Sequence, residues 1–489
     1  MLLYNTLTKA KEKLIHRNDH VKSPNGDHEA SKKIRMFVCG PTVYDYIHIG
    51  NARTFVFFDV VAKYLKYQGY EVDYIQNITD IDDKIIKRAQ EAEREPLDWA
   101  KEYTDKFLED MKGLGVDSPK YAPATEYIEQ VVKQIKTLID KGRAYLIEGD
   151  GWYFDLSTFK DYGKLSGRTT LMADDAISRI DENDKKRNKG DFALWKISKE
   201  GEPAWDFETA KYIGIIGAGP AFAKATAGRP GWHIEDTAIT EHFFGPQYDL
   251  HGGGQDLLFP HHEAEITQQE SASGKKPFVK YWMHVAFLVN KEQKMSKSLG
   301  NFETVNELLK KYPKEVLRFY LLSGYYRSPL DYSDDMLKQS QAAVSRISEF
   351  IQKLHLEAKL PGEVKLPGEV IKSAKEKFLE AMDNDFNTPE AFATIFDMIR
   401  AINPFLAENK VSKKQAEEIL GLLKAINDIM GIIPTEQQKI PAEVQELIEK
   451  REKFRHEKNY EASDEIRTQI RDLGYNVEDT TYGPLPIKN

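Results

Sequence analysis

Residues 34–51 have the sequence IRMFVCGPTVYDYIHIGN, and this stretch decides the fold. Its first six residues are mostly apolar and predict a short buried strand, which a Gly-Pro pair ends. Apolar residues then recur at helical spacing through residues 52–67, and Gly69-Tyr70 ends this helix before a second strand at 71–75. A strand, a helix and a second strand in this order form a βαβ unit, which implies a parallel sheet.

The turn that joins this strand to its helix has the features of an anion-binding site. Backbone N–H groups at a helix N-terminus have no partner inside the helix, and together with the helix dipole they attract phosphate. His48 and Asn51 lie in this turn, and both side chains can donate hydrogen bonds to phosphate oxygens. Taken alone, His48 is more typical of a polar turn residue without a ligand. The predicted ATP contacts in this stretch are Gly40, Thr42, His48, Gly50 and Asn51.

A second motif, KMSKS at residues 294–298, lies well past the middle of the chain. Lys294 and Lys297 are compact cations on long stems, which suits a loop that closes over a polyphosphate as negative charge develops. The plainer alternative is an exposed basic loop without a ligand. Because both motifs occur in one chain, we expect a site that holds ATP from two sides, with Lys297 in contact with ATP. The predicted catalytic residues are His48, Asn51, Lys294 and Lys297.

The composition describes a folded protein with more than one domain. A chain of 489 residues is too long for one ordinary core, so we expect two to four domains. Hydrophobic residues make up 41% of the chain and aromatic residues 11%, which excludes a disordered protein. The net charge is −9, from 69 basic and 78 acidic residues. It excludes a uniformly basic surface, although it is compatible with a local groove for nucleic acid.

The same composition indicates a compartment. Cys39 is the only cysteine, so no internal disulfide can form and the cytosol is the natural location. No apolar run is long enough to span a bilayer, so we expect no membrane association. The first six residues lack the basic segment and the cleavage site of a signal peptide. The sequence therefore predicts a cytoplasmic protein.

Beyond the βαβ unit, the elements predict an α/β domain followed by a mostly helical region. Residues 85–113 predict one charged helix, strand and turn signals return over 246–290, and helical periodicity dominates from 305 onward. The tandem copy KLPGEV-KLPGEV at 359–370 is typical of a linker between helices. The glycine-rich stretch 213–223 resembles a dinucleotide-binding fingerprint, but no clear βαβ unit surrounds it, so a small flexible insertion is favoured.

The two phosphate motifs resemble the HIGH and KMSKS signatures of class I aminoacyl-tRNA synthetases. Asn51 stands where the first signature has its second histidine, so a donor is kept, an imidazole is lost, and we expect a weaker phosphate contact. The surrounding residues are similar to one family of this class, the cysteinyl-tRNA synthetases, over nearly the whole chain. The matching stretches are FVCGPTVYD at 37–45, NITDIDDK at 77–84, GWHIE at 231–235, HGGGQD at 251–256 and FPHHEAE at 259–265.

This resemblance implies a Rossmann-like parallel-sheet catalytic domain with an insertion, followed by a mostly α-helical C-terminal anticodon-binding region. The expected parts are the first half of the catalytic domain at 1–145, an insertion at 146–228, the second half at 229–300 ending in the lysine loop, a stem-contact region at 301–345, a helical-bundle anticodon-binding domain at 346–435, and a small tRNA-contacting domain at 436–489.

The resemblance also implies a zinc ion that binds the substrate thiol at the floor of the pocket. Carried onto this chain, the ligands are Cys39, Asp236, His261 and Glu265, and thiolate, imidazole and carboxylate are all competent zinc ligands. His261 and Glu265 have i, i+4 spacing, so they share one face if this stretch is helical. The plainer alternative is that Cys39 is a small buried hydrophobe and His261 a turn residue.

Position 236 departs from the family pattern, which has a cysteine there. Asp236 either binds zinc through oxygen in a harder site, or lies behind the ligands and orients one of them, or marks the loss of the metal. We carry forward the first hypothesis, with one zinc ion per subunit. A zinc–thiolate bond lets an enzyme bind cysteine and reject serine. The shape of a pocket alone discriminates between side chains this similar only about 10–200-fold.

The remaining site residues and the reaction are likewise implied by the resemblance. Asp256 is expected to pair with the substrate ammonium group, Trp232 to form a wall of the pocket, and Thr79 and His251 to contact the substrate or its adenylate. The implied reaction ligates L-cysteine to tRNA-Cys through a cysteinyl-adenylate, with ATP bound as its Mg²⁺ complex. The implied oligomeric state is a monomer.

Residues 378–402 resemble the helical anticodon-binding domain of the family, and a basic cluster follows in the tail. By itself such a cluster is typical of a solvated helix face, but beside a synthetase head it indicates an anticodon contact. The cluster comprises Lys450, Arg451, Lys453, Arg455 and Lys458. Three alternatives stay open: a cysteine-activating ligase with a small-amine acceptor, a tRNA-binding paralogue without catalysis, and a dinucleotide-dependent oxidoreductase built on residues 214–219.

Overall fold

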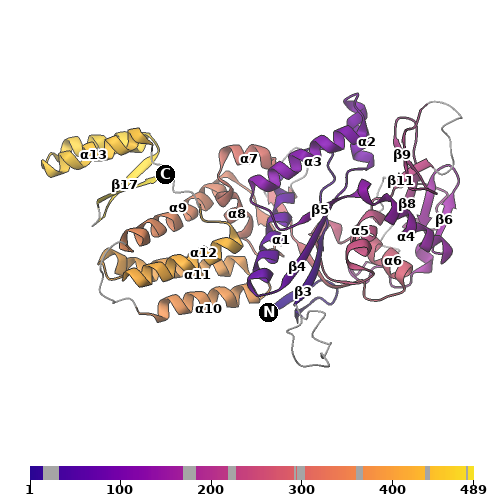
Figure 1. Ribbon diagram of the computed structural model, residues 1–489, viewed down its shortest axis with the longest axis horizontal. Helices are drawn as coiled ribbons and strands as arrows, with labels where there is room; N and C mark the ends of the chain where they lie inside the picture. The colour runs from indigo at the N-terminus through magenta and orange to yellow at the C-terminus, as the bar shows by residue number, and fades with distance from the viewer. Residues whose placement is uncertain are drawn as a thin grey trace. The chain divides into compact units, whose positions relative to one another are not determined.

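The computed structural model describes residues 1–14, 32–168, 183–217, 227–290, 293–294, 303–358, 367–434, 441–480 and 483–488. The chain forms two compact units (Figure 1). Unit 1 comprises Met1–Lys310 and Tyr326–Leu330, and unit 2 comprises Lys311–Tyr325 and Asp331–Asn489. Both motifs of the predicted ATP site belong to unit 1.

A five-stranded parallel sheet forms the centre of unit 1 (Figure 1). The predicted βαβ unit is confirmed as β3 (Lys33–Val38), α1 (Ile49–Tyr67) and β4 (Glu71–Ile78). The sheet has the order β13-β12-β3-β4-β5, and its further strands are β5 (Lys120–Pro123), β12 (Tyr248–Gly254) and β13 (Val279–Val285). The strand order reverses between β3 and β12, and open α/β sheets bind ligands at the carboxyl ends of the strands at such a point.

Helix α1 packs against the sheet and is buried along most of its length. The helix ends at Gln68, and Gly69 follows with a φ of 84°, a conformation that favours glycine. Arg53 is its buried cation, and the guanidinium donates hydrogen bonds to the carbonyls of Ala286 at 2.8 Å, Phe287 at 3.1 Å and Ser328 at 2.9 Å. These bonds tie the start of α1 to the segment that follows β13 and to Ser328.

The predicted helix at 85–113 is two helices, α2 (Asp83–Glu91) and α3 (Pro96–Gly113). Glu93 has a φ of 54°, which interrupts a right-handed helix. Pro96 has no backbone N–H and therefore suits the first position of a new helix. The charge-rich pattern predicted the helical character of this segment but missed the turn within it.

Three helices pack together beside the sheet, α4 (Ile128–Asp140), α5 (Ile234–Phe244) and α6 (His261–Ser273) (Figure 1). Helix α6 is buried from His261 to Ala272 although nine of these twelve residues are polar. Buried polar groups are stable when they are hydrogen-bonded. Glu263 accepts hydrogen bonds from the N–H groups of Leu165 at 2.8 Å and Ser166 at 2.6 Å, so that α6 is anchored through its polar side chains.

An antiparallel sheet with the order β10-β9-β11-β8-β7-β6 follows α4 along the chain and precedes α5. Its strands are β6 (Ala144–Ile147), β7 (Gly151–Phe154), β8 (Phe192–Ile197), β9 (Pro203–Asp206), β10 (Tyr212–Ile215) and β11 (Ala227–Pro230). The glycine-rich stretch 213–223 begins in β10, which pairs antiparallel with β9, and residues 218–226 lie outside the described residues. The first three residues of this stretch are therefore in a strand, and the prediction of a flexible insertion stays a prediction for the rest. A dinucleotide fingerprint also requires a parallel βαβ unit, which β10 does not provide.

Shorter elements complete unit 1. The hairpin of β1 (Leu2–Asn5) and β2 (Ala10–Lys13) contacts β13. The remaining elements are β14 (Leu288–Asn290), β15 (Gln293–Lys294), α7 (Val305–Lys311) and β16 (Leu330–Asp331), of which α7 and β16 each end one residue inside unit 2.

Unit 2 is mostly helical, as the sequence predicts (Figure 1). Its elements are α8 (Lys314–Leu322), α9 (Asp334–Glu357), α10 (Glu369–Asp383), α11 (Thr388–Ala407), α12 (Lys413–Met430), α13 (Ala442–His456), α14 (Tyr460–Asp472), β17 (Tyr475–Thr480) and β18 (Gly483–Lys488). Helices α8 to α12 pack against one another. The linker expected at 359–370 falls outside the described residues up to 366, and its last two residues begin α10. None of the helices in the described parts of the chain has the length and apolarity to cross a membrane.

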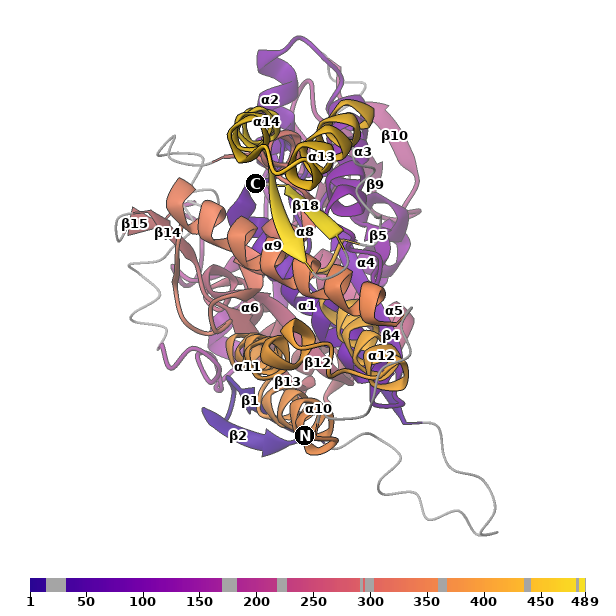
Figure 2. The same cartoon turned by 90° about the vertical axis from the view of Figure 1, so that its left-hand side faces the viewer.

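The last elements of unit 2 form a small module with a core of its own. Helices α13 and α14 pack side by side, and α14 also contacts β17 (Figure 2). The apolar core of this module consists of Val444, Ile448, Ile466, Ile470, Tyr475 and Val477.

Candidate active site and metal centre

A cleft of about 470 Å³ opens at the carboxyl ends of the parallel strands, beside the point where the strand order reverses. Its walls come from the loops after β3 and β4, the first turns of α1, and the segments after β12 and β13. The predicted site residues that line it are Cys39, Gly40, Thr42, His48, Gly50, Asn51, Thr79, Trp232, Asp236, Asp256 and His261. Residues more than 200 positions apart in the sequence thus meet in one cavity.

Of the remaining four predicted site residues, two do not line the cleft and two are not fully described. His251 and Glu265 are fully buried and do not line the cleft. Lys294 is the last residue of the short strand β15, and its side chain is not described. Lys297 lies outside the described residues. The expected contacts of Lys294 and Lys297 with ATP therefore stay a prediction.

His48 begins helix α1 as its N-cap residue. The His48 Nδ1 accepts a hydrogen bond from the Asn51 N–H at 3.2 Å, and the Asn51 Oδ1 accepts one from the His48 N–H at 3.4 Å. This reciprocal pair is a capping box, in which an acceptor at the third helical position is needed. A Cβ at Gly50 would lie 2.8 Å from His48 Nδ1, so glycine lets the ring fold back over the turn. Asn51 therefore has a structural role at the position where the signature departs.

The predicted metal ligands meet at the floor of the cleft. One ligand atom from each of Cys39, Asp236, His261 and Glu265 lies within 4.8 Å of the others, and all four residues are buried. His261 Nε2 is 3.0 Å from Asp236 Oδ2 and 2.8 Å from Glu265 Oε1. The stretch that contains His261 and Glu265 is helical, so their i, i+4 spacing places them on one face of α6.

Asn77, the second-last residue of β4, connects Asp236 with the loop that carries Cys39. The Asn77 Nδ2 donates a hydrogen bond to Asp236 Oδ1 at 2.6 Å, and its Oδ1 accepts one from the Gly40 N–H at 2.6 Å. A Cβ at Gly40 would lie 1.8 Å from the backbone oxygen of Asn77, so this close approach requires glycine. One amide thus fixes the loop that carries Cys39 and the helix that carries Asp236. It also leaves Asp236 with a single oxygen directed at His261.

Burial gives this floor unusual protonation. Burial, with the nearby Glu265 carboxylate, raises the pKa of the Cys39 thiol well above its usual value. Burial likewise raises the pKa of Glu265 to about 8. For His261 burial lowers the pKa, but the carboxylates of Glu265 and Asp236 outweigh it and raise the pKa to about 10. Acidic groups crowded in a dry pocket are stabilised in their charged forms by a bound cation.

The floor fits a borderline divalent ion. Its donors are a thiol, an imidazole and two carboxylates, which are the ligand types that zinc takes in proteins. Glu265 Oε2 is buried and has no hydrogen-bond partner among the described residues. A buried, unsatisfied carboxylate oxygen is uncommon in a folded protein and is expected where an ion binds. The residues therefore suit a metal, as the resemblance implies.

Sequence reasoning missed two residues of this floor. His262 Nε2 lies 3.2 Å from Cys39 Sγ, on the side opposite to the cleft. Glu235 is buried beside Asp236 and accepts a hydrogen bond from the Thr79 hydroxyl. The available signals were the second histidine of the FPHHEAE stretch and the acidic pair at 235–236.

The basic cluster of the tail is only partly exposed. Arg451 is buried and pairs with both carboxylate oxygens of Asp479, at 2.7 Å and 2.9 Å. Arg455 lies 3.2 Å from the same carboxylate. Arg451 thus stabilises the module, which corrects the expectation that it belongs to an RNA-contacting face. Lys450, Lys453 and Lys458 remain exposed.

Comparison with known proteins agrees with this arrangement. Residues 26–342 match the family of tRNA synthetases class I (C) catalytic domains, residues 377–434 match the DALR domain, and residues 437–482 match the cysteinyl-tRNA ligase anticodon binding domain. The cysteine–tRNA ligase of Carboxydothermus hydrogenoformans is 43% identical, and that of Clostridioides difficile is 40% identical. Each comparison covers 99% of this chain and 99% of the relative.

Solved structures share the fold at low sequence identity. The methionyl-tRNA synthetase of Mycobacterium tuberculosis in complex with methionyl-adenylate is 15% identical, with a TM-score of 0.60 over 82% of this chain and 92% of that one. The Agrobacterium radiobacter K84 agnB2 LeuRS in its ternary complex is 12% identical, with a TM-score of 0.61 over 83% of this chain and 85% of that one. With the full-length relatives at about 40% identity, the chain belongs to the cysteine–tRNA ligase family of class I aminoacyl-tRNA synthetases.

Proposed function

We propose that this enzyme ligates L-cysteine to tRNA-Cys with the consumption of ATP, through a cysteinyl-adenylate. One observation supports this above all: a single cleft joins the first turn of α1 to a floor of thiol, imidazole and carboxylate groups. The first feature suits a nucleotide phosphate, and the second suits a metal that recognises a thiol. The full-length relatives named cysteine–tRNA ligase support the same substrate.

In the first step the carboxylate of cysteine attacks the α-phosphate of ATP, and pyrophosphate leaves. No protein nucleophile is required, so the enzyme acts by positioning the reactants and by stabilising charge. We assign the phosphate contacts to Gly40, Thr42, His48, Gly50 and Asn51, with Mg²⁺ accompanying ATP. Lys294 and Lys297 approach from the other side as charge develops on the phosphates.

In the second step a ribose hydroxyl at the 3′ end of the tRNA attacks the acyl carbon of the adenylate, and AMP leaves. Unit 2 supports a tRNA acceptor, because residues 377–434 and 437–482 match the DALR and anticodon-binding families. An acceptor as small as a free amine has no use for these domains. A catalytically inactive tRNA-binding paralogue is disfavoured by the retained residues His48 and Asp256 in the cleft.

Recognition of cysteine is assigned to the lower part of the cleft. Asp256 pairs with the ammonium group, while Trp232 and Thr79 form the walls. Cys39, Asp236, His261 and Glu265 would hold a zinc ion on the substrate side, and the ion would supply a bond to the thiol that serine cannot match. His251 acts from behind Cys39, because its ring does not reach the cleft. We place the reaction in the cytoplasm and propose a monomer.

The test is ATP–pyrophosphate exchange in the presence of cysteine or serine, followed by charging of tRNA-Cys. We expect exchange with cysteine, little with serine, and transfer to tRNA-Cys. Lys297→Ala should lower the exchange rate, since a cation that meets the developing charge is removed. Exchange that proceeds equally with serine would refute the cysteine assignment, and exchange without transfer to tRNA would favour the small-amine acceptor.

A further inference from the structure

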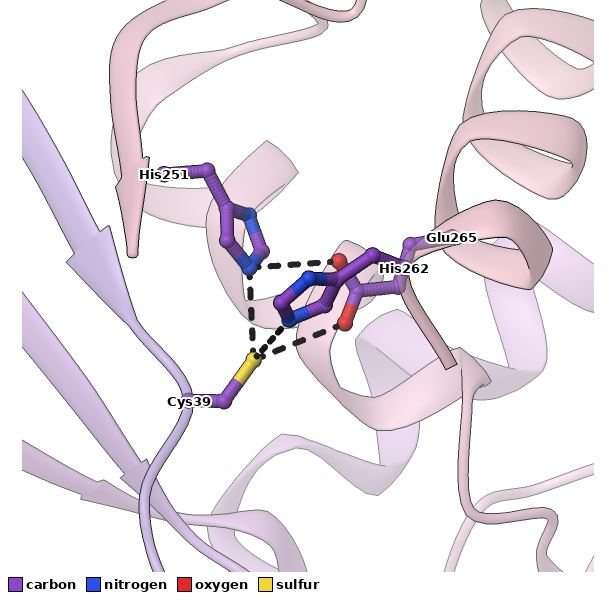
Figure 3. Close-up of side chains that lie close together, drawn as sticks. All are labelled: Cys39, His251, His262 and Glu265. Carbon is purple, nitrogen blue, oxygen red and sulfur yellow. Dashed lines mark hydrogen bonds and ion pairs between the residues drawn. The ribbon is translucent and has the colours of Figure 1, made fainter. Parts of the chain in front are cut away.

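Some side chains of the cleft are held by buried partners that do not line it. Figure 3 shows one case, in which the rings of His251 and His262 are directed at the Cys39 sulfur, each at 3.2 Å. Neither ring lines the cleft, so the two histidines form a wall behind Cys39. This wall extends to the start of the chain, since His262 Nδ1 lies 2.8 Å from His284 Nε2 and His284 Nδ1 lies 2.8 Å from the Thr6 hydroxyl. A cleft residue can thus depend on groups that the substrate does not touch.

Thr79 has such a partner in Glu235. The Thr79 hydroxyl donates a hydrogen bond to Glu235 Oε1, and Thr79 lines the cleft whereas Glu235 does not. Glu235 is 1% exposed, and its Oε2 has no hydrogen-bond partner among the described residues. A carboxyl group buried with so few hydrogen bonds lowers stability, so its presence calls for a functional reason. The Thr79 hydroxyl is the group through which Glu235 can act on the cleft.

The backbone of Thr79 is fixed by the turn that follows β3. Its N–H donates a hydrogen bond to the Pro41 carbonyl at 3.0 Å, and its carbonyl accepts one from the Val43 N–H at 3.1 Å. Beside these bonds, Thr79 keeps the freedom of its side-chain torsion and of its hydroxyl proton. The hydrogen bond to Glu235 removes this freedom, because it holds the proton on the side of Glu235.

The hydrogen bonds of the Thr79 hydroxyl therefore have a fixed direction. A hydroxyl group has one proton and two lone pairs. The proton of Thr79 goes to Glu235, and one lone pair accepts a hydrogen bond from Asn77 Nδ2 at 3.4 Å. The same Nδ2 donates to Asp236 Oδ1 at 2.6 Å, and Asn77 and Asp236 both line the cleft. The Thr79 oxygen thus lies beside cleft-lining groups, with a second lone pair but no proton for a bound molecule.

From this direction we propose that Glu235 is a positioning residue for the substrate: it holds the Thr79 proton, so that Thr79 accepts a hydrogen bond from the ammonium group of cysteine. With the thiol at the cleft floor, the ammonium group is the donor that cysteine can offer, because its carboxylate only accepts. The same lone pair repels the carboxylate, which leaves it free for the α-phosphate of ATP. Thr79 then acts together with Asp256, the expected partner of the ammonium group. The inference rests on the proposed function, in which cysteine is the substrate.

Two analogues of cysteine separate the groups that Thr79 can meet. Cysteamine keeps the thiol and the ammonium group, whereas mercaptopropionate keeps the thiol and the carboxylate. Each is tested as an inhibitor of cysteine-dependent pyrophosphate exchange by the wild-type enzyme, by Thr79→Val, which has nearly the same shape without the hydroxyl, and by Thr79→Ser, which keeps it. We expect Thr79→Val to raise the inhibition constant of cysteamine at least about tenfold and that of mercaptopropionate less than about threefold, because a hydrogen bond to a charged group is lost only with the first. Thr79→Ser should recover most of the affinity for cysteamine.

A matched pair of substitutions tests the role of Glu235. Glu235→Met fills a similar volume without an acceptor, and Glu235→Gln keeps an oxygen that can accept the Thr79 proton. We expect Glu235→Met to raise the KM for cysteine roughly tenfold, with a smaller change in the KM for ATP, and Glu235→Gln to recover most of the affinity. Added to Thr79→Val, Glu235→Met should change the KM for cysteine by less than about a further twofold, since substitutions that remove one shared contact are not additive. A residue that only supports the fold would add its full effect.

The outcomes separate this role of Glu235 from the alternatives. Equal losses for the two analogues, additive effects of Glu235→Met and Thr79→Val, or a loss in Glu235→Gln as large as in Glu235→Met would each overturn the proposal. A greater loss for mercaptopropionate would also overturn it, because the Thr79 proton would then face the cleft. Where circular dichroism shows that Glu235→Met does not fold, the comparison of analogues in Thr79→Val decides. A wild-type enzyme without cysteine-dependent exchange would refute the proposed function and this inference with it, whereas normal exchange with unseparated analogues would refute the inference alone.

Discussion

Asn77 uses one side-chain amide to hold two parts of the cleft floor, the Gly40 N–H and the Asp236 carboxylate. Asn77→Ala would release both the loop that carries Cys39 and the oxygen of Asp236. We expect the KM for cysteine in pyrophosphate exchange to rise roughly 10–100-fold, the usual effect of losing a partner that orients metal ligands. The KM for ATP should rise by less, because Asn77 contacts only Gly40 among the assigned phosphate residues and the capping box of α1 does not involve it. Parallel rises in both constants would show general damage to the cleft instead.

Asp110 on α3 is a buried carboxylate whose Oδ2 has no hydrogen-bond partner among the described residues. Burial raises its pKa to about 6. The folded state therefore binds a proton more tightly than the unfolded state, so the stabilisation is full below about pH 4 and is lost as pH rises through 6. At pH 7 Asp110→Asn should raise the free energy of unfolding of unit 1 by about 1–3 kcal/mol, and near pH 4 it should have little effect.

Urea denaturation at both pH values measures this difference. Asp117→Asn is a suitable control, because Asp117 has 77% of its side chain exposed and the same substitution there should change stability by less than about 0.5 kcal/mol. A gain for Asp110→Asn that is equal at pH 4 and pH 7 would contradict the role of burial.

Individual residues also mark what the sequence could and could not predict. The spacing of His261 and Glu265 predicted a shared helix face, and the structure has that helix. His262 is one position further, about 100° around the same helix, so periodicity assigns it to a different face. It meets Cys39 because the first turn of α6 packs beside the residue that follows β3 and beside Gly253 of β12. Such a contact depends on tertiary packing and leaves no local pattern.

At the scale of elements, replacing glycine by alanine is expected to have opposite effects on stability inside helix α12 and at its end. Gly431 ends α12 with a φ of 64°, and a Cβ there would lie 2.6 Å from the Arg318 Nε that donates to the Met430 carbonyl. Gly431→Ala should therefore destabilise unit 2 by about 1–3 kcal/mol. Gly421 lies exposed within the same helix, with nothing near its added Cβ, so Gly421→Ala should stabilise it by about 0.4–1 kcal/mol. Thermal unfolding of the two variants checks both values, and shifts of the same sign would refute this account of the helix end.

The elements differ in how far the sequence specified them. The βαβ unit was predictable, because an apolar strand, a helical period and a second strand follow each other within 45 residues. The break between α2 and α3 was missed, since the charged pattern continues across it. Helix α6 has no amphipathic pattern, because it is buried from His261 to Ala272 and several of its polar side chains bond to distant parts of the chain. Periodicity detects helices with one exposed face and has no signal for such a helix.

At the scale of the whole molecule, the two chemical steps are assigned to different parts of the chain. The cleft lies in unit 1, whereas the module that starts at α13 has a separate apolar core and matches an anticodon-binding family. A chain that ends at residue 434 should therefore keep cysteine-dependent pyrophosphate exchange. Its charging of tRNA-Cys should fall at least about tenfold, equivalent to 1.4 kcal/mol of lost tRNA binding. Loss of exchange in the shortened chain would show that the module also supports the catalytic unit, and unchanged charging would remove the module from tRNA recognition.

The hydrogen bond between Thr6 and His284 joins residues 278 positions apart, and the residues that pair between β3 and β12 are 214 positions apart. During synthesis, the wall behind Cys39 can close only after the ribosome has added residue 284. At roughly 5–20 residues per second this takes on the order of ten to fifty seconds after β3 has emerged. Until β12 has been made, β3 has one unpaired edge, which is a template for aggregation, and for the whole interval the only thiol of the chain is open to oxidation. A pocket that is buried in the finished enzyme is thus exposed for tens of seconds while the enzyme is made.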